Sequence, residues 1–259
     1  MSITALITGA SSGLGAEFAR YHASKGGDVI ITARREPELL QLKSELETKY
    51  GVTVHAIPLD LGAEDGAKRL YEACQAIGAD INVLINNAGF GGLGVHVERD
   101  LAAEKSMIEL NITALVSLTH MVGGDMVKSG GGKILNVGST AGFIPGPNQA
   151  VYFATKAFVN SFSQAIDQEL REKGVTCSVL APGYVETEFA KVGGLEDTAM
   201  VKAGGASAAE VAKMGYDAMT EGKLVTINDR KLSFLLNWVL PFMPRRNVLK
   251  MVQKNQAPA

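Results

Sequence analysis

The chain has 259 residues, of which 46% are hydrophobic and 20% charged, and its formal net charge is −2. Such a chain can bury a large core as a single α/β domain, and its balanced charge gives no electrostatic reason to expect a nucleic-acid partner. No apolar run reaches the roughly 20 residues that cross a bilayer, and Met1-Ser2 is not followed by the basic start of a signal peptide. We therefore expect a cytoplasmic protein. Cys74 and Cys177 match no metal-ligand spacing, so we expect reduced thiols and no metal site.

Short, β-branched apolar runs alternate with segments of helical periodicity. We expect strands at residues 3–7, 28–32, 53–58, 82–86, 133–137, 175–181 and 224–227. We expect helices at residues 13–26, 36–50, 63–78, 98–129, 150–173 and 207–221. The strand runs are nearly continuous in apolar residues, which is typical of parallel strands covered by helices on both faces. The pattern predicts an α/β fold, a doubly wound parallel sheet of the Rossmann type, as one domain over residues 1–228 with a C-terminal helical appendix over 229–259.

Residues 184–206 fit this alternation poorly, because they contain four glycines and few periodic apolar positions. A long irregular segment after the sixth strand, at the carboxyl edge of the sheet where ligands bind, predicts a mobile lid. Within it Glu186 and Glu188 flank Thr187, and we expect both carboxylates to be solvated rather than to act as general acids or bases.

The first predicted strand runs directly into the glycine-rich segment from Thr8 to Gly15. Glycines at such a turn let the backbone approach a pyrophosphate, and the helix expected from about Gly13 would point its free N–H groups at that anion. A tight strand-to-helix turn without a ligand is the alternative. Because the segment follows an N-terminal strand and precedes a helix, the dinucleotide-binding interpretation is favoured.

The end of the second predicted strand indicates which dinucleotide would bind. An acidic residue there would bond the ribose 2′-hydroxyl of NAD, but the sequence reads Ala33-Arg34-Arg35. Guanidinium groups suit the 2′-phosphate of NADP, which they can bind through two parallel hydrogen bonds. We therefore predict NADP(H) as the cofactor; the alternative is that one or both arginines are simply solvated.

Two further strand ends carry polar residues suited to the same ligand. Asp60 can accept a hydrogen bond from the adenine amino group or can cap the next helix. The fourth strand ends in Asn86-Asn87-Ala88-Gly89, where small residues let a cofactor pass and asparagine amides can tie strand ends together.

Five motifs in this order resemble those of the short-chain dehydrogenase/reductase family, in its short single-domain branch. They are the Thr8–Gly15 segment, Asn86-Asn87-Ala88-Gly89, Asn111, Ser139 followed by Tyr152-x-x-x-Lys156, and Pro182-Gly183. The resemblance covers about residues 1–190 well and 191–227 loosely.

The resemblance implies a catalytic tetrad of Asn111, Ser139, Tyr152 and Lys156, in which Asn111 anchors a water and Lys156 bonds the nicotinamide ribose. One departure is Gly138, which stands where relatives often carry a second serine and which we expect to widen the local backbone options.

The resemblance also implies that Val185 and Thr187 contact the carboxamide of the nicotinamide. With the strand-end residues, the expected cofactor-binding set is Gly9, Ser11, Ser12, Gly13, Leu14, Gly15, Arg34, Arg35, Asp60, Leu61, Asn87, Ala88, Gly89, Tyr152, Lys156, Pro182, Gly183, Val185 and Thr187.

Tyr152 and Lys156 lie four residues apart, which places them on one face of a helix. A phenol with its ordinary pKa near 10 is a poor base, and we expect the Lys156 ammonium to lower the Tyr152 pKa. Tyr152 would then donate a proton to the carbonyl oxygen in reduction and take it back in oxidation, while Ser139 holds the same oxygen.

The expected substrate pocket contains no arginine clamp for a carboxylate or phosphate. Its predicted wall is Phe90, Leu93, Phe143, Ile144, Tyr184, Phe189 and Val192. We therefore predict an NADP(H)-dependent oxidoreductase that reduces an apolar ketone or aldehyde. The alternatives are an NADP-dependent dehydrogenase of hydroxysteroid-like or aryl alcohols and a non-catalytic NADP(H)-binding regulator.

The tail from Leu232 to Leu240 is unusually apolar and is followed by Arg245, Arg246 and Lys250. It could cover the substrate pocket, pack against another subunit or lie on an anionic membrane surface as a peripheral contact. From the family resemblance we expect a homodimer or homotetramer that packs through the helices at 98–129 and 150–173.

Overall fold

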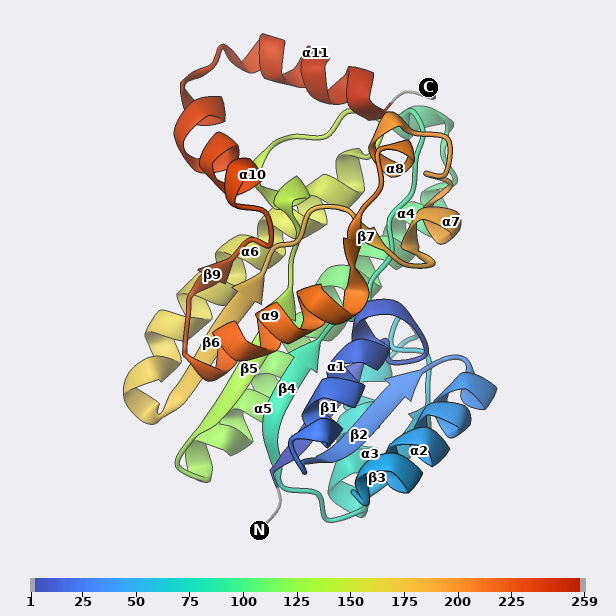
Figure 1. Cartoon of the computed structure of the whole chain (residues 1–259), viewed down its shortest axis with the longest axis vertical. Coiled ribbons are helices and arrows are strands. Elements are labelled where there is room, and N and C mark those ends of the chain that lie inside the picture. The colour runs from blue at the N-terminus through green and yellow to red at the C-terminus, as the bar shows by residue number, and fades with distance from the viewer. Residues whose placement is uncertain (1–2, 257–259) are drawn as a thin grey trace.

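A computed structural model gives the fold of the chain and describes residues 3–256, so the outermost ends of the predicted domain and tail lie outside the described residues. Seven parallel strands form the central sheet in the order β3-β2-β1-β4-β5-β6-β9 (Figure 1). They are β1 (Thr4–Thr8), β2 (Asp28–Ala33), β3 (Val54–Pro58), β4 (Ile81–Asn86), β5 (Gly132–Val137), β6 (Val175–Leu180) and β9 (Val225–Thr226). The predicted doubly wound sheet is confirmed, and each of these strands lies within one residue of its predicted ends.

Helices cover both faces of the sheet (Figure 1). One face carries α1 (Gly13–Ser24), α2 (Glu36–Tyr50) and α9 (Ala208–Thr220), and the other carries α3 (Gly66–Ala76), α5 (Leu115–Lys128) and α6 (Ala150–Leu170). Successive strand residues supply the two cores in turn: in β1, Ala5 and Ile7 enter the first core and Leu6 the second. Because both faces are buried, the three central positions of β1 are all apolar, which explains the continuous apolar runs in the sequence.

The prediction of one continuous helix over residues 98–129 is wrong. The structure has a 3-10 turn at His96–Glu98, α4 (Leu101–Ile108), a π-helical turn at Glu109–Ala114 and then α5. Asp100 begins α4, since its carboxylate accepts a hydrogen bond from the Ala102 N–H at 3.0 Å. The π-helical turn contains Asn111, and such turns are frequent where a helix must present a functional side chain.

The segment 184–206 contains more regular structure than predicted. It forms β7 (Val185–Glu186), α7 (Phe189–Gly193) and α8 (Ala199–Lys202), and it leads into β8 (Ala206–Ser207). β7 and β8 pair in parallel as a separate two-stranded sheet, which ties the two ends of the segment together. Short 3-10 turns follow β5 and α6, at Thr140–Phe143 and Arg171–Lys173.

The C-terminal tail is helical, as predicted for the appendix. It comprises α10 (Arg230–Phe234), a π-helical turn at Leu235–Val239, a 3-10 turn at Leu240–Phe242 and α11 (Arg245–Gln256). In Figure 1 this red segment lies at one end of the molecule, where α11 packs beside α8. Leu236, Leu240, Val248 and Val252 are buried in a cluster with Phe153 of α6. Within residues 3–256, no helix combines the length and hydropathy needed to span a membrane.

One buried carboxylate holds α6 against β6. Asp167 is 4% exposed and accepts hydrogen bonds from the Cys177 N–H at 2.9 Å and from the Arg171 guanidinium at 2.7 Å. The clamp joins β6 to the helix that carries Tyr152 and Lys156.

Replacing Asp167 by alanine should lower the free energy of unfolding by about 2–3 kcal/mol, because the Cys177 N–H would be left buried without a partner and Arg171 would lose its anion. Urea denaturation followed by circular dichroism measures this change. Glu169→Ala, at an exposed position of the same helix, should change the stability by no more than about 0.5 kcal/mol. Equal effects of the two variants would contradict the clamp.

Candidate active site

A large cavity, of about 1070 Å³, opens at the carboxyl ends of β1, β4, β5 and β6. Its lining extends from the glycine-rich segment at one end to the tail helices at the other. The strand order reverses between β1 and β4, and ligands of open α/β sheets bind outside the carboxyl ends of the strands at such a point.

The glycine-rich segment has the backbone that a pyrophosphate cradle needs. Gly9 and Gly13 have φ values of +69° and +53°, a region that costs residues with a Cβ atom conformational energy. A Cβ atom on Gly15 would lie 2.3 Å from the Gly9 carbonyl oxygen, so only glycine lets α1 approach the loop this closely. Because α1 begins at Gly13, its free N–H groups lie at this loop, and the segment fits a dinucleotide phosphate.

Nearly all of the predicted cofactor-binding residues border this cavity; Gly15 is the exception. The steric contact with Gly9 gives Gly15 a packing role between helix and loop. Asp60 does border the cavity, but it does not cap α3, which begins at Gly66 with Asp65 in the cap position. Its carboxylate instead accepts a hydrogen bond from the Gly62 N–H at 3.0 Å.

Asparagine side chains fix the strand ends around the cavity. The Asn87 amide donates to the carbonyl oxygens of Thr8 and Gly9 at 2.9 and 3.2 Å, and the Thr8 hydroxyl accepts from the Asn87 and Ala88 N–H groups at 3.0 Å. The Asn86 amide donates to Asn136 of β5 at 2.9 Å. The expectation that these amides tie strand ends together is confirmed.

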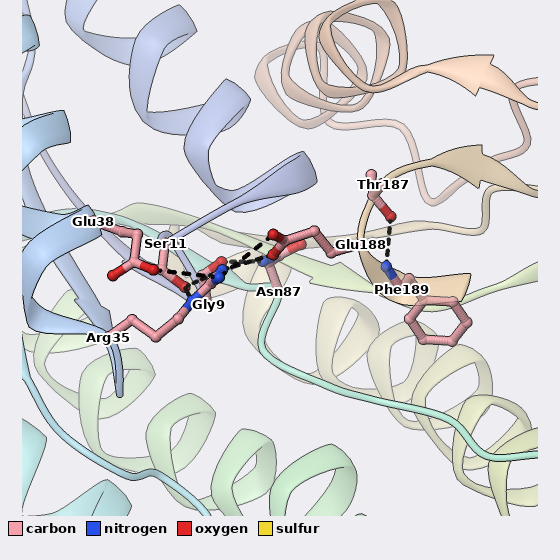
Figure 2. Close-up of polar contacts among 8 residues, drawn as sticks. All are labelled: Gly9, Ser11, Arg35, Glu38, Asn87, Thr187, Glu188 and Phe189. Carbon is pink, nitrogen blue, oxygen red and sulfur yellow. Dashed lines mark hydrogen bonds and ion pairs between the residues drawn. The ribbon is translucent and has the colours of Figure 1, made fainter. Parts of the chain in front are cut away.

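Arg35 lies at the centre of a polar group at the rim of the glycine loop (Figure 2). Its guanidinium lies 2.8 Å from the Glu188 carboxylate and 3.4 Å from that of Glu38, and it donates to the Ser11 hydroxyl at 3.2 Å. The hydrogen bond from Arg35 lowers the pKa of Glu188. The Glu188 carboxylate is exposed, as expected, and it also links the segment after β7 to the end of β2. Arg34 is exposed at the same rim of the cavity.

Ser139, Tyr152 and Lys156 come together at the inner wall of the cavity, as predicted from their spacing. Lys156 is 6% exposed; its Nζ lies 5.9 Å from the Tyr152 ring centroid and donates to the Val137 carbonyl oxygen at 2.8 Å. The Ser139 hydroxyl donates to the Pro182 carbonyl oxygen at 3.4 Å and accepts from the Ala141 N–H at 3.0 Å. Both α6 side chains thus face the end of β5 from successive helical turns.

Asn111 lies behind this group and does not border the cavity. Its side chain is buried, accepts a hydrogen bond from the Phe90 N–H at 3.1 Å, and donates to the Phe90 carbonyl oxygen at 3.0 Å and to the Thr155 hydroxyl at 3.1 Å. These contacts join the π-helical turn to the loop after β4 and to α6.

Burial governs the titration of the two α6 groups. It raises the pKa of Tyr152 to about 12, while the hydrogen bond from Ser139 acts in the opposite direction. Burial also lowers the pKa of Lys156 to about 8. The expected lowering of the Tyr152 pKa is therefore wrong, because removal of the phenol from water outweighs any attraction to the ammonium.

Gly138 is explained by packing rather than by backbone freedom. A Cβ atom there would lie 2.0 Å from Asn160 Oδ1 and 2.9 Å from a Val179 methyl group. Asn160 is buried and donates to the Ser139 carbonyl oxygen at 3.0 Å. In this chain Asn160 of α6 occupies the space that a second serine would need, which corrects the prediction that Gly138 widens the backbone options.

The substrate side of the cavity is mostly apolar. Of the predicted wall, Phe90, Ile144, Tyr184, Phe189 and Val192 line it, whereas Leu93 and Phe143 do not. Phe143 packs instead in the cluster between α6 and the tail. The tail contributes residues that sequence reasoning did not assign to the wall: Leu232, Leu235, Leu236, Leu240, Met251 and Val252. Their apolar helical spacing was the available signal, and the tail covers the pocket, as one of the three interpretations expected.

The lowered pKa of Lys156 gives stability a specific pH dependence. The pKa is about 8 in the folded protein against the ordinary 10.5, so the unfolded chain binds more protons between these values. The destabilising effect of Lys156 is therefore full below pH 8 and is relieved as the pH rises towards 10.5. Relative to Lys156→Met, which cannot titrate, the wild type should gain about 2–3 kcal/mol of stability between pH 7 and pH 10.

Urea denaturation of both proteins at the two pH values measures this difference. Lys105→Met, at an exposed position of α4, should leave the stability difference from wild type nearly constant. A constant difference for Lys156→Met as well would show that the folded protein does not lower the Lys156 pKa.

Comparison with known proteins agrees with this geometry. Residues 3–196 match the model of the short chain dehydrogenase family. The chain is 39% identical to sulfoacetaldehyde reductase 2 of Chromohalobacter salexigens over 194 residues, which cover 74% of this chain and 76% of that protein. It spans only 56 to 61% of the length of several longer relatives that it also matches.

Two solved structures resemble the whole fold. A short-chain dehydrogenase from Sphingobium yanoikuyae in complex with NADPH has a TM-score of 0.84 and 31% identity, and the match covers 98% of both chains. The bulky-bulky ketone specific alcohol dehydrogenase from Comamonas testosteroni has a TM-score of 0.77 and 28% identity, over 94% of this chain and 95% of that one. The chain is an oxidoreductase of the short-chain dehydrogenase family.

Proposed function

We propose that the protein is an NADP(H)-dependent carbonyl reductase that acts on apolar ketones or aldehydes. The observation that carries this proposal is the position of Ser139, Tyr152 and Lys156 on one wall of a cavity that begins at the glycine-rich loop and ends among apolar tail residues. The loop suits a dinucleotide, and the apolar end suits a bulky, weakly charged substrate. The similar Comamonas enzyme is described as specific for bulky-bulky ketones, which supports the same substrate class here.

In this mechanism the protein places and protonates the substrate. A bound nicotinamide cofactor supplies the hydride in reduction and accepts it in oxidation. The Ser139 hydroxyl holds the carbonyl oxygen, and Tyr152 gives its phenol proton to that oxygen as the carbon is reduced. The Lys156 ammonium stabilises the phenolate left on Tyr152 and would bond the nicotinamide ribose. Asn111, held by Phe90 and Thr155, positions the loop and helix around these groups.

The Tyr152 phenol serves the reaction in both directions, as an acid in reduction and as a base in alcohol oxidation. Burial raises the Tyr152 pKa to about 12, so the phenol carries the proton that reduction consumes. The proposed NADP(H) preference favours ketone reduction in the cell over dehydrogenation of hydroxysteroid-like or aryl alcohols. The assembled Ser139, Tyr152 and Lys156 also favour an enzyme over a non-catalytic regulator.

NADP(H) is the proposed cofactor because of the cations at the end of β2. Arg34 and Arg35 both border the cavity beside the glycine-rich loop. Arg35 already holds the Glu188 carboxylate at 2.8 Å, so its guanidinium can bind an anion at this place. The similar Sphingobium dehydrogenase was solved with NADPH, which supports this choice.

The protein is further proposed to be a cytoplasmic homodimer or homotetramer. Exposed apolar side chains on α4 and α6, namely Leu101, Ile108 and Phe158, support packing through the helices expected to form the subunit contact. The outward side chains Phe234, Trp238 and Phe242 of the tail are also exposed, and cations follow them. They could contact either a neighbouring subunit or an anionic membrane surface.

Tyr152→Phe should lower kcat by about 10²–10⁴-fold, because the phenylalanine ring has no proton to donate. NADPH oxidation followed by absorbance, with ketones and aldehydes graded in size and polarity, measures turnover, and fluorescence titration measures NADPH binding. Binding should be nearly unchanged, and Tyr71→Phe, on α3 and outside the cavity lining, should retain activity. Retained activity in Tyr152→Phe would overturn the assignment of Tyr152 as the proton donor. In the same assay, wild-type turnover that rises with substrate hydrophobicity would support the apolar pocket.

Arg34→Asp should reverse the cofactor preference, since a carboxylate repels the 2′-phosphate and can bond the ribose 2′-hydroxyl. We expect the ratio of kcat/KM for NADPH over NADH to fall by about 100-fold, equivalent to about 2.7 kcal/mol. Arg69→Asp makes the same charge change at an exposed position of α3 outside the cavity lining and should leave the ratio unchanged. If both variants keep the wild-type ratio, Arg34 does not bind the 2′-phosphate of NADPH.

A further inference from the structure

Two glutamines interrupt the apolar end of the cavity. Gln149 directly precedes α6 and is 2% exposed, and Gln256 ends α11 and is 5% exposed. Both border the cavity, although they are 107 residues apart in sequence. Every cationic residue that lines the cavity, Arg34, Arg35 and Lys156, belongs to the cofactor rim or the catalytic wall. The tail end therefore offers a substrate neutral amides and no cation.

The hydrogen bonding of this pair is incomplete. Gln149 Nε2 donates to Gln256 Oε1, but Gln149 Oε1 is buried and has no partner among the described residues. The side chain of Gln149 does not cap α6 either, although the residue stands in the cap position. A buried amide oxygen without a partner is unfavourable, and a ligand that supplies the missing hydrogen removes this cost.

We propose that Gln149, held by Gln256, is a substrate-binding residue that recognises a hydroxyl group on the ketone. This inference rests on the proposed reductase function and narrows its substrate class to apolar ketones that carry a neutral hydroxyl. A hydroxyl can both donate and accept a hydrogen bond. It can therefore donate to the unpartnered Gln149 Oε1, and it would equally accept from Nε2 if the amide had the opposite orientation. A carboxylate or phosphate does not fit, because no cation lies at this end to balance it.

The position of Gln149 in the sequence places the proposed hydroxyl subsite close to Tyr152 along the chain. Gln149 lies immediately before α6 and three residues before Tyr152, and both residues border the same cavity. The hydroxyl and the carbonyl of one substrate can then be held by residues close together in the chain. Gln256 fixes the amide of Gln149 and also brings α11 over the pocket, which gives the tail a part in substrate selection.

The test compares two ketones of equal size that differ only in a hydroxyl or a methyl group at one position. The wild type should prefer the hydroxylated ketone by about tenfold in kcat/KM, equivalent to about 1.4 kcal/mol. Gln149→Met, a side chain of similar length without an amide, should reduce this ratio to about one by losing activity only on the hydroxylated ketone. Gln168→Met, at an exposed position of α6, should keep the wild-type ratio.

Gln256→Met gives a second variant at the partner position and should also reduce the ratio, because Gln149 would no longer be held. The subsite would be overturned if Gln149→Met lost equal activity on both ketones, or if the wild type showed no preference for a hydroxylated ketone at any hydroxyl position. The glutamine pair would then have a structural role or bind a water molecule. Binding of the two ketones, measured by the change in Tm of the NADPH complex, is independent of turnover. Preferential binding without turnover would support the subsite while refuting the reductase proposal.

Discussion

The junction between β1 and β4 is the constraint on which the rest of the site depends. Thr8 and Asn87 exchange backbone and side-chain hydrogen bonds across the point where the strand order reverses. Because β1 and β4 are parallel and the chain continues from β1 into α1 on one face of the sheet and from β4 towards α5 on the other, a groove opens above this point. The Gly9 and Gly15 contact then fixes how closely α1 approaches that groove. The loop that fits a phosphate is thus a consequence of strand order and of the close contact between Gly9 and Gly15, and not of any one side chain.

Helix α6 converts this groove into a reactive site, at a cost in stability. It brings Tyr152 and Lys156 to the end of β5, where burial shifts both pKa values away from those of the free side chains. A buried ammonium with one carbonyl partner is unfavourable, and the apolar cores on both faces of the sheet must offset it. Asp167 and Asn160 anchor the same helix to β6 and to the Ser139 backbone, so the reactive groups are held by contacts along α6.

The sequence was sufficient to predict the features that depend on local pattern. Continuous apolar runs predicted the strands, because burial on both faces removes alternation, and the glycines after the first strand predicted the tight turn into α1. Tyr152 and Lys156 could be paired because helical spacing alone sets their common face. The break at Asp100 and the π-helical turn around Asn111 were missed, since the apolar period continues through both and only the side-chain hydrogen bonds distinguish them.

What could not be predicted depends on contacts between residues far apart in sequence. Glu188 reaches Arg35 over 153 residues, and Asn160 excludes a side chain at Gly138 from a different element. No local pattern encodes such distances, because each depends on where an entire helix or loop is packed. The tail is the clearest case: its apolar residues predicted burial, but only the fold shows that one set faces the pocket while Phe234, Trp238 and Phe242 face outward. The proposed substrate pocket therefore depends mainly on long-range packing, whereas the proposed catalytic residues lie in short, local motifs.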